Sequence, residues 1–131
     1  MTDETAFTRW LAAYGAALGS CDWETCGKLF TGDAMFLPTP FDKPVRGGAA
    51  IAGYLQDFWS RFDRISFFSD VIAPGWAHWH AAGGLDPLEE SVQFDGILNA
   101  EFGPHGLCTQ LRLWTVTLSP RESDMLSQRD A

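Results

Sequence analysis

The feature of this 131-residue chain that most limits its fold is a change in the spacing of its apolar residues near Arg64. Before that point, apolar residues recur every three or four positions, which is the period of an amphipathic helix. After it, runs rich in Val, Ile, Phe and Trp are separated by turn residues, which is typical of strands. Helices followed by strands with short turns predict an α+β fold with an antiparallel meander.

Three helices are predicted in the first half of the chain. The first covers about residues 4–19, and a short second helix is expected within residues 22–30. Residues 48–62 carry the clearest helical pattern of the sequence. Between the second and third helices, the short apolar run at 33–38 predicts one strand, which is followed by a loop rich in proline and glycine.

Four further strands are predicted in the second half. They correspond to the runs at 65–72, 75–82, 91–102 and 107–118. The remaining residues, 119–131, are polar and charged, so we expect a surface tail. A chain of this length has room for one hydrophobic core, and residues 1–131 are therefore predicted to form a single domain.

The charge of the chain limits its partners and its location. Seventeen acidic residues against nine basic ones give a formal net charge of -8, which argues against binding to nucleic acid or to an anionic membrane. No apolar run approaches the roughly 18 residues that a membrane span needs, and the first residues do not resemble a secretion signal. We therefore expect a cytoplasmic protein.

The three cysteines and the aromatic residues carry further information. Cys21, Cys26 and Cys108 are odd in number and lack metal-type spacing, which favours free thiols in a reducing compartment. Six tryptophans and ten phenylalanines exceed what a core of this size needs. Such an excess is typical of a large apolar pocket or of an oligomer interface, and composition does not separate the two.

Four segments carry a more specific pattern: YGAALGSCD at 14–22, LFTGDAMF at 29–36, RGGAAIAGY at 46–54, and FDGILNAEFGPHG at 94–106 followed by LRLW. Together these segments resemble the NTF2-like superfamily, in its SnoaL-like and ketosteroid-isomerase-like branch. The resemblance covers most of residues 4–118. It implies a cone in which three N-terminal helices pack on a strongly curved antiparallel sheet, with a cavity on the concave face, and it implies a homodimer.

Strand alternation predicts which residues face that cavity. From Val92 onward, every second residue is apolar, so Phe94 and Leu98 share one face with Phe102 while Asp95 lies on the other. On the last strand, Leu111, Leu113 and Thr115 are expected to join the concave face. With the apolar faces of the helices, these positions predict a small-molecule pocket lined by Trp10, Tyr14, Phe58, Phe62, Phe94, Leu98, Phe102, Leu111 and Leu113.

The resemblance also allows the catalytic groups of the family to be compared. Ketosteroid isomerases combine a carboxylate base with an oxyanion hole made of a tyrosine and a protonated aspartic acid. Tyr14 matches that tyrosine, but the base position falls on or near Pro38 and the second donor position falls on Leu98. The acid and base residues of the related epoxide hydrolases are also missing. Steroid-type isomerisation and epoxide hydrolysis are therefore disfavoured.

His78 and His80 are the remaining candidates for an acid or a base. They lie two positions apart on one predicted strand and so share a face opposite Trp79. If that face is concave, an imidazole could transfer protons near neutral pH; the pattern slightly favours the outward alternative. A third metal ligand near the two histidines is not evident, so neither a metal nor a cofactor is expected.

Three classes of function remain open. The first is binding of a small, mostly apolar molecule, with proton-transfer chemistry of the isomerase, cyclase or lyase type carried by Tyr14, His78 or His80. The second is a non-catalytic ligand carrier on the same scaffold. The third is a dimerisation or protein-interaction module in which Trp76, Trp79 or Trp114 anchors a partner on the convex face of the sheet.

Overall fold

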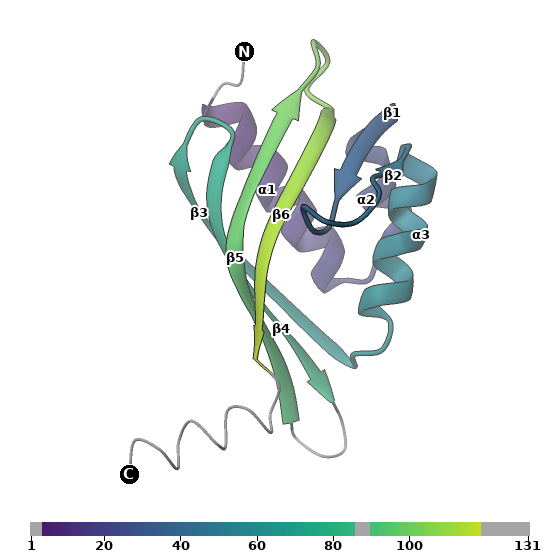
Figure 1. The fold of residues 1–131 in the computed structure, drawn as a ribbon, viewed down its shortest axis with the longest axis vertical. Helices are drawn as coiled ribbons and strands as arrows, with labels where there is room; N and C mark the ends of the chain where they lie inside the picture. Colours follow the sequence, from purple (N-terminus) through teal and green to yellow (C-terminus); the bar gives the residue numbers. More distant parts are fainter. Residues whose placement is uncertain (1–3, 86–89, 119–131) are drawn as a thin grey trace.

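The structure is a computed structural model that describes residues 4–85 and 90–118; the tail expected at 119–131 lies outside the described residues. No helix in these ranges is long and apolar enough to cross a membrane. Figure 1 shows the elements along the chain. Their bounds are α1 (Glu4–Gly19), α2 (Trp23–Lys28), β1 (Phe30–Leu37), β2 (Val45–Arg46), α3 (Gly48–Trp59), β3 (Arg64–Ala73), β4 (Trp76–Leu85), β5 (Glu90–Phe102) and β6 (Cys108–Leu118).

The six strands form one sheet in the order β2-β1-β6-β5-β4-β3. Strands β3 to β6 form the predicted antiparallel meander. One pair differs from the prediction: β1 runs parallel to β6, with Phe36 opposite Leu111. The difference arises because β1 and β6 come from opposite ends of the chain, and no hairpin turn between them sets their relative direction. The α+β cone fold is confirmed, and its sheet is mixed.

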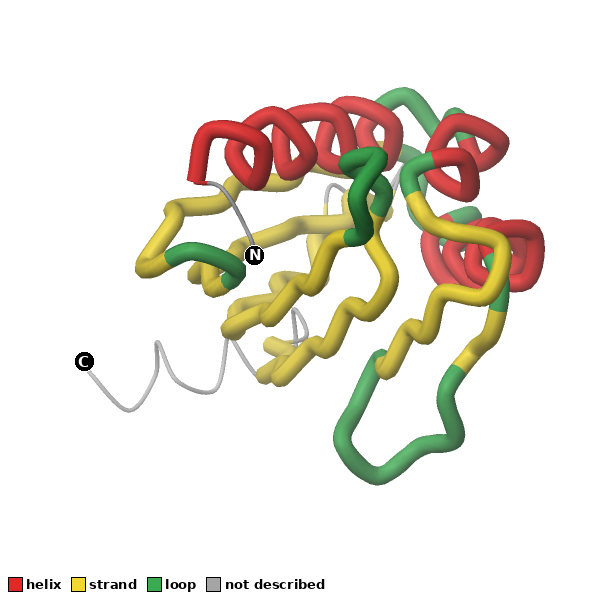
Figure 2. Tube along the Cα trace, turned by 90° about the horizontal axis from the view of Figure 1, so that it is seen from above, coloured by secondary structure: helices red, strands yellow, loops and turns green. Residues whose placement is uncertain are grey.

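The helices pack along one side of the sheet, as Figure 2 shows. Helix α1 contacts β3, whereas α3 contacts β1 and α2. The stripe of apolar residues on α1 is buried, including Phe7 at 0% exposure and Leu18 at 1%. Helix α2 begins after Asp22, whose carboxylate accepts a hydrogen bond from the backbone N–H of Thr25 and so caps the helix.

The alternation along β5 places apolar side chains against the helices and polar side chains outside. Phe94, Leu98 and Ala100 are at most 5% exposed, whereas Asp95 lies on the outer face. At Gly96, β6 passes so close that a Cβ atom would overlap the carbonyl oxygen of Trp114. Glycine is therefore required where the two strands bend across one another, and this bend helps to give the sheet its concave face.

Two of the three cysteines belong to the core. Burial raises the pKa of Cys26 to about 12 and that of Cys108 to about 12, while Cys21 is exposed. The thiolate is the reactive form, so the buried thiols are expected to be inert. In the folded protein at pH 8, we expect a thiol-specific reagent such as Ellman's reagent to modify one cysteine quickly, and all three after denaturation.

The control for this titration is Cys21→Ser. This variant should lack the fast phase, and after denaturation it should show two reactive thiols instead of three. Fast modification of a second thiol in the folded variant would contradict the packing around Cys26 and Cys108.

Candidate functional site

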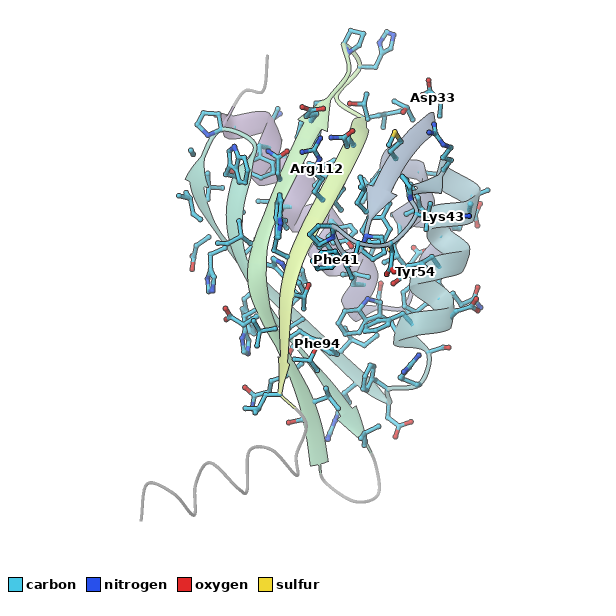
Figure 3. All side chains as sticks on the ribbon, viewed as in Figure 1. Asp33, Phe41, Lys43, Tyr54, Phe94 and Arg112 are labelled. Carbon is cyan, nitrogen blue, oxygen red and sulfur yellow. The ribbon has the colours of Figure 1, made fainter. Side chains whose placement is uncertain are left out.

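A cavity of about 230 Å³ lies between the helices and the concave face of the sheet. Helices α1 and α3 close one side of it, and side chains from every strand except β2 line the other. Figure 3 labels two lining residues, Tyr54 on α3 and Phe94 on β5, which reach it from the helices and from the sheet. The lining consists of Tyr14, Leu18, Phe36, Pro38, Thr39, Tyr54, Leu55, Phe58, Trp59, Phe67, Trp79, Phe94, Leu113, Thr115 and Thr117.

Four of the nine predicted pocket residues line this cavity: Tyr14, Phe58, Phe94 and Leu113. The other five are packed elsewhere and fill the core or its margins, namely Trp10, Phe62, Leu98, Phe102 and Leu111. Leu98 and Leu111 are fully buried among other side chains and do not line the cavity, although Leu113, which is opposite Leu98 in the sheet, does. Strand parity identifies the face of a residue but not its depth along the cone.

Several lining residues were not part of the nine-residue pocket predicted from the sequence. Tyr54 and Leu55 belong to the predicted apolar stripe of α3, and Thr115 has the parity of the predicted concave face, so a signal for all three was present. Pro38 and Thr39 follow β1 in a loop, and no periodic pattern predicts where a loop residue points. Trp79 was expected on the face opposite His78 and His80, and the pattern slightly favoured that face as the inner one, while the interaction hypothesis placed Trp79 on the convex face.

Tyr14 presents its side chain to the cavity from the buried face of α1. The residue is 3% exposed, its ring stacks on Trp10 at a centroid distance of 5.1 Å, and it meets the edge of Phe67. Desolvation by burial raises the pKa of Tyr14, with smaller contributions from Cys26 and Cys108. The phenol is therefore protonated at neutral pH, and it is available as a hydrogen-bond donor because no hydrogen bond to a described residue occupies it.

The other polar groups of the lining are neutral. Thr39, Thr115 and Thr117 supply hydroxyl groups, and burial raises the pKa of Tyr54. None of the described residues that line the cavity is an Asp, Glu, His, Lys or Arg. A charged ligand group would lose its hydration without gaining a partner of opposite charge, so the lining favours a neutral ligand.

Trp79 lines the cavity from β4 and is 4% exposed. Its ring stacks on Phe67 at 6.0 Å, and its indole nitrogen Nε1 is buried without a hydrogen-bond partner in the described part of the chain. Leaving such a donor unsatisfied costs about 1–3 kcal/mol. The convex location considered for Trp79 as a partner anchor is wrong, because Ala77, Trp79 and Ala81 face the helices.

His78 and His80 lie on the opposite face of β4 from Trp79, away from the cavity. Nε2 of His78 lies 2.9 Å from a carboxylate oxygen of Asp95, and Nδ1 of His80 lies 3.2 Å from the other. These hydrogen bonds lower the pKa of Asp95, and the one with His78 contributes most. The structure does not bring either histidine to Tyr14. Among the described residues, no group of His, Cys, Asp and Glu side chains has an arrangement that could hold a metal ion.

The two positions matched to the missing isomerase residues differ in their placement. Pro38 lines the cavity, whereas Leu98 is fully buried and does not. Neither side chain can move a proton, and no described carboxylate takes their place in the lining. The residues described around it form an apolar chamber with hydrogen-bond donors and without an acid–base pair.

Comparison of this structure with solved structures identifies its fold. The epoxide hydrolase/cyclase-like enzyme SalBIII, which acts in pyran ring formation in the polyether salinomycin, superposes with a TM-score of 0.75 at 18% identity over 88% of this chain and 95% of that one. The Δ5-3-ketosteroid isomerase from Mycobacterium sp. has a TM-score of 0.66 at 17% identity, covering 86% and 98%. Further neighbours are SnoaL-like polyketide cyclases by description. This chain has the NTF2-like fold of SnoaL-like proteins.

The likeness is one of structure rather than sequence. No protein-family model matches the chain, and no curated protein is detectably similar in sequence. Another structural neighbour, RV0760c from Mycobacterium tuberculosis, was crystallised in complex with estradiol-17beta-hemisuccinate; it has a TM-score of 0.64 at 13% identity, covering 82% of this chain and 91% of that one. At these identities, the shared NTF2-like fold does not transfer an activity.

Proposed function

We propose that this protein binds a small, neutral, mostly apolar molecule in the cavity between its helices and the concave face of its sheet. The observation that carries the proposal is the aromatic lining around about 230 Å³ of space. An apolar cavity of about 150 Å³ accommodates benzene. A molecule of one or two rings therefore matches the volume.

Tyr14 is the group proposed to orient the ligand. Its buried, protonated hydroxyl can donate to a ligand oxygen and can accept from a ligand hydroxyl. The complex of RV0760c with a steroid derivative supports the idea that this fold can hold an apolar ring system. In a mostly apolar site, a single directed hydrogen bond provides orientation while ring burial provides affinity.

The lining favours binding over proton-transfer chemistry. General acid–base catalysis needs a group within hydrogen-bond reach of the ligand whose pKa lies near the working pH. The polar side-chain groups of the described lining are hydroxyl groups and the indoles of Trp59 and Trp79, and burial shifts the pKa of Tyr14 further from neutrality. We therefore propose a ligand-binding protein rather than an isomerase, cyclase or lyase.

The test is a thermal-shift screen with phenols, enones, lactones and polycyclic ketones. A ligand present at about a hundred times its Kd stabilises the fold by roughly 2.7 kcal/mol, which raises Tm by about 5–10 °C in a domain of this size. For phenols, Tyr14→Phe should weaken binding about tenfold, which corresponds to one lost hydrogen bond.

The comparison variant is Tyr54→Phe, because Tyr54 is the only other tyrosine of the chain and also lines the cavity, but is less buried than Tyr14 and is not the group proposed to orient the ligand. This variant should change affinity less than threefold. Failure of every compound class to raise Tm would overturn the proposed function.

We also propose that the protein works as a homodimer in the cytoplasm. The convex-face patch, defined as Phe68, Trp76, Trp114 and Val116, exposes 37% to 74% of each residue. The rings of Trp76 and Trp114 stack at 5.8 Å, which leaves a rigid aromatic surface facing outward. Exposed apolar patches of this kind mark interaction sites. The three free cysteines support a reducing compartment.

We propose that a second copy of this chain covers the convex-face patch, because charged residues of opposite sign lie on the two sides of the patch. Asp70 on β3 and Arg112 on β6 are both exposed on this face. A two-fold axis parallel to the strands would set β3 of one protomer against β6 of its partner and bring these charges together.

A further inference from the structure

The outer edge of β6 is open next to the cavity. Strand β5 pairs with β6 from Cys108 to Leu118, whereas β1 accompanies β6 only as far as Arg112. Figure 1 shows β1 beside the upper part of β6 only. Along residues 113–118, the described part of the chain has no strand on the outer side of β6. The backbone N–H and C=O groups of every second residue there point outward without a strand partner.

This edge lacks the features that usually protect an open strand. Residues 113–118 have the sequence LWTVTL, without a charged residue or a proline. The register shift between β5 and β6 lies at the other end of β6, near Cys108. Charges, prolines and bulges are the common means of preventing another chain from pairing with an edge. Because Thr115, Val116 and Thr117 are exposed, the edge is accessible to an added extended segment.

The open edge and the cavity adjoin one another. Leu113, Thr115 and Thr117 line the cavity, and the two threonines are also exposed, so the cavity reaches the surface along this edge. Neighbouring strands of a sheet lie about 4.8 Å apart and direct their alternate side chains to the same face. A segment paired with residues 113–118 therefore directs every second side chain toward the cavity.

The two features together limit the chemistry of a matching ligand. The cavity of about 230 Å³ has room for an aromatic ring, and none of the described residues that line it is charged. The edge of β6 offers alternating backbone donors and acceptors, which match the N–H and C=O groups of a peptide-like amide. A hydrocarbon or a simple phenol fills the cavity but leaves these backbone groups unpaired.

We propose that the cavity and the open edge of β6 together bind neutral aromatic amides in an extended conformation, with the ring in the cavity and the amide groups hydrogen-bonded to the backbone of residues 113–118. This inference rests on the proposed function and deepens it by naming the class of ligand. A blocked aromatic amino acid is the smallest compound with this chemistry, and an aromatic residue inside an extended peptide presents the same groups.

The experiment compares N-acetylphenylalanine methylamide with the methyl ester of O-acetyl-3-phenyllactic acid. The ester has the same shape, with both amide N–H groups replaced by oxygen. Affinities are measured calorimetrically on the full chain. The ester keeps the ring but cannot donate to β6, so it should bind about tenfold more weakly than the amide. Tyr14→Phe should affect the two compounds to within about threefold of each other, because both place the same ring in the cavity.

Hydrogen exchange at the backbone amides of residues 113–118 locates the contact. In the free protein, every second amide of this segment should exchange quickly, because it has no partner. The amide ligand should slow this exchange, and the ester should not. A blocked tripeptide with phenylalanine at its centre distinguishes the two sources of the ligand: tighter binding than that of the blocked amino acid indicates a peptide, and equal binding indicates a small amide.

Several outcomes would overturn the assignment of the edge while leaving the proposed pocket intact. These are equal affinities for amide and ester, binding of the amide without protection of residues 113–118, and failure of both compounds to bind when members of the thermal-shift screen do. Slow exchange of all these amides in the free protein would also overturn it, and loss of that protection on dilution would identify a second copy as the occupant. If neither compound and no member of the screen binds, the proposed function fails as well.

Discussion

Replacing Gly96 with alanine is expected to destabilise the fold by about 3 kcal/mol and to lower Tm by about 10 °C. The added Cβ would overlap the backbone carbonyl of Trp114, which cannot move aside as a flexible side chain could. The strands would have to separate or straighten at the bend. Because Gly96 lies between Trp79 and Thr115 in the sheet, any such movement would also deform the cavity.

The matched control is Gly53→Ala. Gly53 lies inside α3, is exposed, and a Cβ there would meet nothing within 4 Å. Alanine is the better helix former, so this variant should be more stable than the wild type by about 0.5–1 kcal/mol. Chemical denaturation followed by circular dichroism measures both. A Gly96→Ala variant as stable as the wild type would contradict the close approach of β5 and β6.

The second large effect is expected at the convex-face patch. Trp114→Glu should convert the proposed dimer into a monomer at micromolar concentration, because it removes one of two stacked aromatic rings and places a charge in the contact. A central aromatic residue of an interface contributes about 2 kcal/mol or more, which corresponds to at least a thirtyfold increase in the dimer dissociation constant. Trp114 does not line the cavity, so ligand binding should persist.

Light scattering after size-exclusion chromatography measures the oligomeric state. Ala12→Glu introduces the same charge at an exposed position on α1, far from the convex face, and should leave the dimer unchanged. A monomeric wild type, or a Trp114→Glu variant that remains dimeric, would contradict the proposed interface.

The helices and the faces of β5 could be predicted because each depends on local spacing. The stripe from Phe7 to Leu18 and the alternation around Phe94 and Leu98 follow from helical and strand geometry alone, and both appear in the structure. The parallel pairing of β1 with β6 could not be predicted in this way. It depends on contacts between residues far apart in the sequence, such as Phe36 and Leu111.

The candidate site was predicted less completely than the fold. The face of His78 and His80 depends on the register between β4 and β5. The sequence of the loop between these two strands does not reveal that register, and the structure sets His80 opposite Asp95. The depth of each residue in the cone was also out of reach, so Leu98 and Leu111 were expected in the pocket although they fill the core. The unpaired Nε1 of Trp79 is a property of packing and has no signature in the sequence.

The parallel contact between β1 and β6 has a consequence for synthesis of the chain. On the ribosome, α1, α2 and β1 emerge first, but the strand that pairs with β1 along its inner edge is β6, which is made after every other strand of the described residues. Until β6 emerges, β1 has an unpaired edge and the aromatic side chains of α1 lack much of their cover. Closure of the domain over such a sequence separation is slow compared with folding of a helical bundle. Nascent chains that stall before Cys108 should therefore be targets for chaperones and proteases.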